Sequence, residues 1–283
     1  SYLAHSSQAI PLIQFGVFDG PSSLNLENSS YSISSFVSDW DETRYKEAFD
    51  QVLAYIEAGD IYQANLTFSL FADFEGDPWT FYKDLQLKQK VKHGAFVDLD
   101  SEISILSRSP ELFFKTDSEM NISTRPMKGT QPRDRDAEKD KKNLKFLKND
   151  IKNRAENLMI VDLLRNDISR ISKVGTVKVP ELYKVETYET VHQMTSLIIG
   201  EMNKKTTVAE LFAALFPCGS ITGAPKIRAM EIIHELEKRP RDIYCGTIGW
   251  MAPDGSSEFN VAIRTLLMQN GKAVLNVGGG VVF

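Results

Sequence analysis

The stretch from Ile61 to Phe71 constrains the fold most, because apolar and polar side chains alternate along it. A period of two is the pattern of a β-strand whose two faces meet different surroundings. The apolar face carries Tyr62, Ala64, Leu66, Phe68 and Leu70, and the polar face carries Gln63, Asn65, Thr67 and Ser69. On this pattern alone the polar face can look at bulk water, as it does in many antiparallel sheets.

Further strand patterns come in groups, with helical patterns between them. Helices are predicted at 41–58, within 133–155, at 151–165, and from Thr207 and Pro225 onwards. Strands are predicted at 93–99, 102–107, 111–115, 119–124, 176–179, 184–188 and 190–199. A predicted antiparallel meander of strands 244–251, 258–268 and 272–277 follows, with turns at Pro253-Asp254-Gly255 and Asn270-Gly271. The grouping predicts an α+β fold with large antiparallel β-sheets flanked by helices.

Composition and charge narrow the class of protein. The 283 residues are 42% hydrophobic and 25% charged, which is typical of a globular protein, and no repeat or linker divides them. The net charge of -5 disfavours nucleic acid as a partner, and no apolar run is long enough to cross a membrane. Cys218 and Cys245 are too few for a zinc site or a disulfide framework. We therefore expect a single domain in a reducing cytoplasm.

Five segments concentrate the side chains that could perform chemistry. They are Gly59 to Leu66, Ser107 to Leu112, Arg125-Pro126-Met127-Lys128-Gly129-Thr130, Arg154 to Asp167, and Gly219-Ser220-Ile221-Thr222-Gly223-Ala224-Pro225-Lys226. Lys128 is predicted to lie in a turn bounded by proline and glycine, where a lone lysine is usually solvated. Its amine becomes a nucleophile only if the surroundings lower its pKa.

In this order, the five segments resemble the chorismate-utilising enzymes, which include anthranilate, isochorismate and salicylate synthases. The resemblance runs from about Tyr45 to Phe283 and implies that family's α+β fold. It implies a partial N-terminal segment at 1–40 and a chorismate-binding catalytic domain at 41–283. The family carries a further glutamate soon after the Gly278-Gly279-Gly280 strand, so we expect the C-terminal end to be incomplete.

Lys128 and Gln63 indicate which branch of the family is meant. A lysine before the Gly-Thr pair marks the branch that makes 4-amino-4-deoxychorismate, whereas anthranilate synthases generally carry alanine there. The resemblance implies that Lys128 adds to chorismate covalently and that Asn65 helps to position the substrate. Gln63 matches the lysine base of isochorismate-type relatives and cannot activate water in that way.

Two glutamates could carry the remaining chemistry. A strand-edge residue such as Glu111 is usually solvated, but the resemblance makes it the acid that protonates the leaving 4-hydroxyl. Glu156 shares a helical stripe with apolar residues and needs a partner, which could be Arg154 or Arg165. The resemblance implies instead that Glu156 binds Mg²⁺ together with a carboxylate of chorismate.

The other residues that we expect at the substrate are implied by the same resemblance. They are His192, Thr222, Tyr244, Arg264, Gly278 and Gly279, alongside Gln63 and Asn65. From the residues alone, His192 could be a satisfied core histidine, and Arg264 could reach the surface or bind an anion. The loop of Thr222 could be a structural cap, and the glycines a bulge or bend.

The function implied is amination of chorismate in para-aminobenzoate and folate biosynthesis. Cys218 lacks the surroundings of a glutaminase nucleophile, so ammonia is expected from a glutamine amidotransferase subunit. Two alternatives stay open: an anthranilate or isochorismate-type synthase, and a non-catalytic subunit that binds chorismate.

Overall fold

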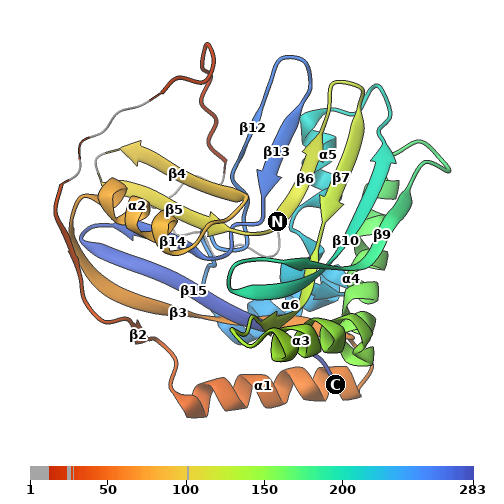
Figure 1. Cartoon of the computed structure of the whole chain (residues 1–283), viewed down its shortest axis with the longest axis horizontal. Coiled ribbons are helices and arrows are strands. Elements are labelled where there is room, and N and C mark those ends of the chain that lie inside the picture. The colour runs from red at the N-terminus through yellow and green to blue at the C-terminus, as the bar shows by residue number, and fades with distance from the viewer. Residues whose placement is uncertain (1–12, 24–26, 28, 101) are drawn as a thin grey trace.

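The computed structural model describes residues 13–23, 27, 29–100 and 102–283, which form two antiparallel β-sheets with helices around them (Figure 1). The first sheet has eight strands: β1 Tyr31–Ile33, β2 Val37–Ser38, β3 Gln63–Gly76, β4 His93–Asp100, β5 Ile103–Ser109, β11 Gly223–Ala224, β14 Thr265–Gln269 and β15 Lys272–Val281. The second has seven: β6 Leu112–Thr116, β7 Asn121–Arg125, β8 Met127–Pro132, β9 Lys178–Thr187, β10 Val191–Glu201, β12 Gly249–Met251 and β13 Ser257–Asn260. The predicted α+β class is confirmed.

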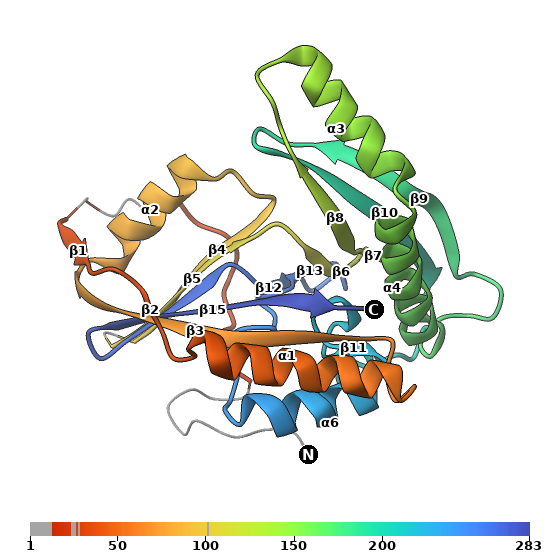
Figure 2. The same ribbon diagram turned by 90° about the horizontal axis from the view of Figure 1, so that it is seen from below.

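The helices cover the two sheets separately. Figure 2 shows α1 (Glu42–Glu57) and α6 (Lys226–Glu237) side by side beneath β3 and β15. They enclose a hydrophobic core that includes Ala64 and Leu66 of β3, Val52 of α1 and Ile232 of α6. The second sheet packs against α3 (Ala137–Asn149), α4 (Ile151–Ser169) and α5 (Val208–Leu215), and α2 (Pro78–Lys88) lies on the first.

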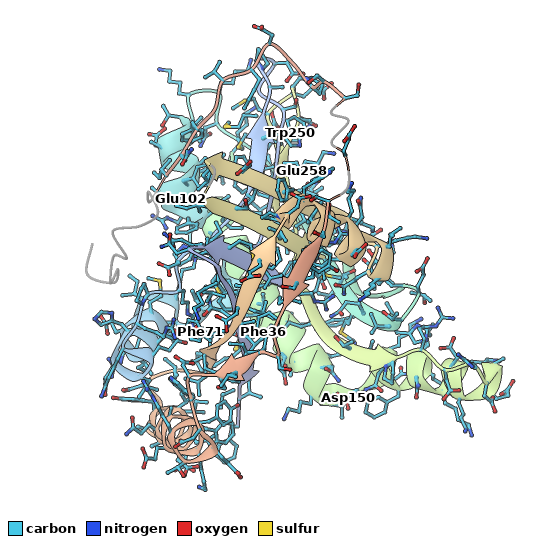
Figure 3. All side chains as sticks on the ribbon, turned by 90° about the vertical axis from the view of Figure 1, so that its left-hand side faces the viewer. Phe36, Phe71, Glu102, Asp150, Trp250 and Glu258 are labelled. Atoms are coloured by element: carbon cyan, nitrogen blue, oxygen red, sulfur yellow. The ribbon has the colours of Figure 1, made fainter. Side chains whose placement is uncertain are left out.

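Helix ends follow the capping residues in the sequence. Asp41 accepts a hydrogen bond from the Arg44 amide at the start of α1, and Thr207 and Glu210 form the predicted capping box of α5. The helical pattern of 133–165 is divided in two at Asp150, which ends α3 and caps α4 (Figure 3). The predicted helices are thus confirmed, whereas α2 was not predicted.

The predicted C-terminal meander is wrong in two respects. Of the expected strand 244–251, only β12 at Gly249–Met251 is a strand. The expected strand 258–268 is two strands, since β13 belongs to the second sheet and β14 to the first. The chain crosses between the sheets at Val261 to Arg264, where Arg264 has a φ of 51°. The two sheets also meet through side chains, because His93 Nδ1 lies 2.8 Å from a carboxylate oxygen of Glu258.

In the middle of one edge of β3, side chains rather than a neighbouring strand form the hydrogen bonds to the backbone. β11 pairs with Gln63 and Ala64, and β2 pairs with Leu70 and Phe71, which leaves a gap between them. In that gap, Glu237 accepts from the Thr67 amide at 2.9 Å, and Arg241 donates to the Asn65 carbonyl at 2.7 Å. A buried ion pair of 2.7 Å joins Glu237 and Arg241. The two side chains thus take the place of a neighbouring strand.

Two further predictions concern the chain as a whole. Among the helices of the described residues, none is long and apolar enough to cross a membrane. Residues 1–12 of the expected N-terminal segment 1–40 lie outside the described residues, as do 24–26 and 28.

Candidate active site

The polar face of β3 is buried. Gln63 and Ser69 have no exposed surface, and Asn65 and Thr67 are 7% and 3% exposed. The strand is confirmed, but its polar face is buried rather than exposed to bulk water, and Lys128 of the second sheet lies near Gln63 beside Gly280. A polar face enclosed by protein needs partners for its donors and acceptors.

Gln63 lacks such partners. Both the amide nitrogen and the amide oxygen of its side chain are buried without a hydrogen bond to the described residues. A Cβ placed on Gly280 would lie 3.2 Å from Gln63 Nε2 and 3.4 Å from Lys128 Nζ. Gln63 and Lys128 therefore border the same small space beside Gly280. A buried amide with no partner is a place where a bound molecule can supply the missing hydrogen bonds.

Lys128 lies in a strand rather than in the predicted turn. β8 pairs with β10, with Gln193 opposite Thr130 and Thr195 opposite Met127. Two residues of β8, Lys128 and Gly129, therefore face the single residue Met194, which is a β-bulge. Gly129 has a φ of 84°, a conformation in which glycine is favoured. The bulge redirects the side chain of Lys128 out of the regular alternation of the strand.

The surroundings of Lys128 favour its neutral form. Desolvation lowers the pKa of the amine, while electrostatic attraction to the ionised forms of Glu111 and Glu156 acts in the opposite direction. No carboxylate among the described residues forms an ion pair with Lys128. The amine is therefore desolvated, and no ion pair with a described carboxylate stabilises its charged form.

Glu111 is held immediately before β6 by its backbone. Its amide donates to the Ser109 hydroxyl at 3.2 Å, and its carbonyl accepts from the Val261 amide at 3.1 Å. The side chain is 4% exposed, and its Oε1 atom has no hydrogen-bond partner in the described residues. Burial raises the pKa of Glu111 to about 7, although the Ser220 hydroxyl, the Lys128 charge and the Met127 amide oppose this rise.

Glu111 and Lys128 together can perform acid catalysis and nucleophilic addition. A carboxyl that keeps its proton near neutral pH can protonate a leaving oxygen. An amine whose pKa is lowered can attack carbon, because only the neutral amine has a free electron pair. The structure places Lys128 near both Glu111 and the unpartnered amide of Gln63.

Glu156 of α4 faces the same region, since its charge acts on Lys128. Neither arginine considered as its partner pairs with it: Arg165 binds Asp162 at 2.9 Å, and Arg154 lies over the Tyr183 ring. Among the described residues, no cluster of three or more His, Cys, Asp or Glu side chains could hold a metal. A single free carboxylate fits Mg²⁺ only if water and a bound anion supply the other ligands, as they often do for this ion. Magnesium thus stays a prediction.

Two predicted anion-binding features are open to a ligand. β14 pairs with β15 only as far as Leu275, so Gly278 and Gly279 have β3 on one side and no strand on the other within the described chain. The prediction that Arg264 lies in the middle of a strand is wrong, because it lies in the crossover between β13 and β14. Burial lowers the pKa of its guanidinium, and within the described ranges of the chain no charged partner offsets this effect. Binding of an anion here stays a prediction.

The three remaining predicted residues have protein partners. The Thr222 hydroxyl donates to the carbonyls of its own loop, and Tyr244 is buried in a turn after α6 rather than on the predicted strand. His192 is buried, with Nδ1 at 3.0 Å from the Thr187 hydroxyl and Nε2 at 2.9 Å from Asp140. With a partner at each ring nitrogen, His192 fits the alternative of a satisfied core histidine. Contact of Thr222, Tyr244 and His192 with a substrate stays a prediction.

Comparison with known proteins agrees with this geometry. Residues 6–283 match the family model described as chorismate binding enzyme. The chain belongs to this family. Aminodeoxychorismate synthase component 1 of Escherichia coli K12 is 44% identical over 252 residues, which are 88% of this chain and 55% of that protein. Anthranilate synthase component 1 of Saccharolobus solfataricus is 37% identical, over 87% of this chain and 59% of its own length.

A solved structure supports the family assignment. Anthranilate synthase component I from Streptococcus pneumoniae TIGR4 superimposes with a TM-score of 0.80 and 31% identity, over 91% of this chain and 56% of that chain. The chain spans about half the length of the curated relatives that it matches. The match therefore concerns only part of each of those proteins.

Sequence reasoning missed several residues of this family member's site. Gly280 borders Gln63 and Lys128, and Ser220 acts on the pKa of Glu111. Glu237 and Arg241 hold the edge of β3 at Asn65. Ser220 lies in the segment Gly219 to Lys226, which the sequence did single out. Nothing in the sequence indicates that Glu237 contacts Thr67, a residue that lies 170 positions earlier.

Proposed function

We propose that this chain catalyses the amination of chorismate at C4 to give 4-amino-4-deoxychorismate, a step towards para-aminobenzoate and folate. The observation that carries the proposal is that Lys128, whose pKa is lowered, lies within electrostatic reach of Glu111, whose pKa is raised to about 7. The similarity to aminodeoxychorismate synthase component 1 supports it, at 44% and 43% identity for two enterobacterial proteins.

In the first step Lys128 Nζ forms a bond to C2 of chorismate. The ring double bonds shift and the C4–O bond breaks. Glu111 gives its proton to the departing oxygen, which leaves as water. Gln63 and Asn65 orient the ring through the buried amide groups of β3, and the open backbone of Gly278 and Gly279 receives a carboxylate.

In the second step ammonia adds to C4, the double bonds shift back, and the C2–N bond breaks. Lys128 leaves as the amine, and the proton that the new ammonium group loses returns to Glu111. The overall change is chorismate plus ammonia to aminodeoxychorismate plus water.

The ammonia comes from a glutamine amidotransferase subunit in this proposal. Both cysteines are buried, and burial raises the pKa of Cys218 to about 12 and that of Cys245 to about 11. Neither thiol therefore supplies a thiolate at neutral pH. Two unpaired cysteines also favour a reducing compartment such as the cytoplasm.

Glu156 would hold Mg²⁺ in this proposal. Bound there, the ion would anchor the ring carboxylate of chorismate and withdraw electron density from the diene. The chain itself contributes the carboxylate of Glu156, which forms no ion pair with an arginine in the part of the chain that the structure describes.

Product analysis tests the proposed function. The purified chain is incubated with chorismate, Mg²⁺ and an ammonium salt, and the products are separated and weighed by mass spectrometry. We expect aminodeoxychorismate from the unmodified chain and from Lys90→Ala, an exposed lysine that pairs with Glu189. Lys128→Ala should lose about 100-fold or more of this product and form 2-substituted chorismates or anthranilate instead. Anthranilate or isochorismate as the main product of the unmodified chain would contradict the proposal, and absence of any turnover would favour a chorismate-binding subunit.

A further inference from the structure

The bulge that presents Lys128 is spanned by one side chain of the neighbouring strand. Gln193 of β10 lies opposite Thr130. Its Nε2 donates to the Gly129 carbonyl at 2.9 Å, and its Oε1 accepts from the Thr130 hydroxyl at 2.8 Å. The carbonyl can only accept, so the orientation of the amide group is fixed by these two contacts.

The bulge needs such a contact because it leaves backbone groups outside the ladder. Where Lys128 and Gly129 oppose the single residue Met194, regular pairing between β8 and β10 is interrupted. Gln193 is 9% exposed, so its amide replaces a ladder hydrogen bond in surroundings that exclude most water. The Gln193 side chain thus stabilises β8 at the bulge of Lys128 and Gly129, where the register of pairing with β10 shifts.

A slip would move the amine of Lys128. Moving the pairing of a strand by one residue turns each side chain to the other face. On the far side of β8 the backbone has little freedom, because a Cβ on Gly129 would lie 2.6 Å from Asn153 Oδ1 and 3.0 Å from Leu147. Asn153 is itself fixed by Asp150 at 2.7 Å. The bulge is therefore held between Gln193 and the α3–α4 junction.

From these contacts we infer that Gln193 is a positioning residue for Lys128, which fixes the bulge so that the amine points at the substrate. The inference rests on the proposed function, since Lys128 is the nucleophile there. Gln193 acts through the Gly129 carbonyl and need not touch chorismate. This role of Gln193 could not be predicted from the sequence around Lys128, because the two residues are 65 positions apart.

Gln193→Met is the sharpest variant. Methionine keeps the length and flexibility of the side chain but offers no amide donor, so packing is retained while the bond to Gly129 is lost. Thr130→Val is the matched control, because it removes the contact to Oε1 and keeps the contact to Gly129. Gln193→Glu is the second variant, in which the hydroxyl of Thr130 keeps its acceptor and Gly129 loses its donor.

We expect Gln193→Met and Gln193→Glu to lower kcat by about 10- to 100-fold, because a misplaced nucleophile reacts slowly. KM for chorismate should stay within about threefold, since binding groups on β3 and β15 are unchanged. Thr130→Val should keep kcat within about threefold. A loss of structure alone would lower the amount of active enzyme for all variants and would appear in thermal melting.

Competitive acetylation of the free enzyme gives a second readout that needs no turnover. The rate at which Lys128 is acetylated, relative to exposed lysines, should change in Gln193→Met and not in Thr130→Val. Unchanged kcat and unchanged acetylation in Gln193→Met would overturn the inference, as would an equal loss in Thr130→Val. If the unmodified enzyme makes no aminodeoxychorismate, the proposed function fails, and the acetylation rates alone decide the role of Gln193.

Discussion

At the scale of single residues, the site combines an acid and an amine whose pKa values are both shifted towards the neutral form. Burial raises the pKa of Glu111 and lowers that of Lys128. An acid that keeps its proton and an amine that gives it up are what a leaving hydroxyl and an electrophilic carbon require. This arrangement lowers the stability of the folded state when Glu111 is ionised, because a buried carboxylate without a full set of hydrogen-bond partners is destabilised.

This cost gives a pH-dependent prediction. The pKa of Glu111 is raised from 4.5 to about 7, so the folded state binds more protons than the unfolded state between these values. The stability contributed by the neutral carboxyl is present below pH 4.5 and is lost as pH rises through about 7. Glu111→Gln removes this loss, so its free energy of unfolding relative to the unmodified chain should rise by about 1–3 kcal/mol between pH 5 and pH 8.

Urea unfolding at several pH values measures this difference, with the exposed Glu119→Gln as the control. A difference between Glu111→Gln and the unmodified chain that stays flat from pH 5 to pH 8 would show that the carboxyl is solvated. In the same range, kcat/KM of the unmodified enzyme should fall as pH rises through about 7, because Glu111 loses its proton.

Gly280 gives a second prediction at this scale. A Cβ there would lie 3.2 Å from Gln63 Nε2, so the Gln63 side chain would have to move by a few tenths of an ångström, and it would fill the space next to Lys128 Nζ at 3.4 Å. Gly280→Ala should therefore fold with little change in Tm but lower kcat by about 10-fold or more. Steady-state kinetics and thermal melting measure the two effects, and an unchanged kcat would place the reacting amine elsewhere.

At the scale of elements, the site depends on an edge that side chains complete. Glu237 satisfies the Thr67 amide and hydroxyl, and Arg241 binds the carbonyls of Asn65 and Ile221. Two separate parts of the site, β3 and the loop before β11, are thus joined by one buried ion pair. The bulge of β8 is the other element that departs from regular pairing, and it carries Lys128.

Glu237→Ala should therefore be strongly destabilising. It leaves the Arg241 charge without its carboxylate and the Thr67 amide without an acceptor, and breaking one side of a buried pair costs about 3–5 kcal/mol. Glu235→Ala, two residues earlier on α6, removes only an exposed hydrogen bond to Tyr55 and should cost less than about 1 kcal/mol. Denaturant unfolding compares the two variants, and equal losses would show that the edge contact contributes little.

At the scale of the whole molecule, local patterns predicted most elements but not how they come together. Alternation located β3, and capping residues located α1 and α5. Turn sequences on both sides made 258–268 look like one strand of a meander, because periodicity does not say to which sheet a residue belongs. The buried polar face of β3 could not be told from a solvated one, since residues near it, such as Lys128 of the second sheet, come from elsewhere in the chain.

The same limit applies to the candidate site. Glu111 and Lys128 were found through their motifs, while the bulge, Gly280 and the contact of Gln193 depend on pairing between distant strands. The placing of Lys128 in a turn was wrong because proline and glycine around it suggested a turn, whereas Pro126 separates two strands and Gly129 forms a bulge.

Mass spectrometry of the enzyme stopped during turnover tests the central claim most directly. Chorismate and Mg²⁺ are mixed with the enzyme at limiting ammonium, the reaction is stopped within the first turnover, and the peptides are sequenced. The peptide that contains Lys128 should carry the mass of chorismate less one water, and the modification should disappear when ammonium is added before stopping. An unmodified Lys128 in a sample that is accumulating aminodeoxychorismate would contradict the account.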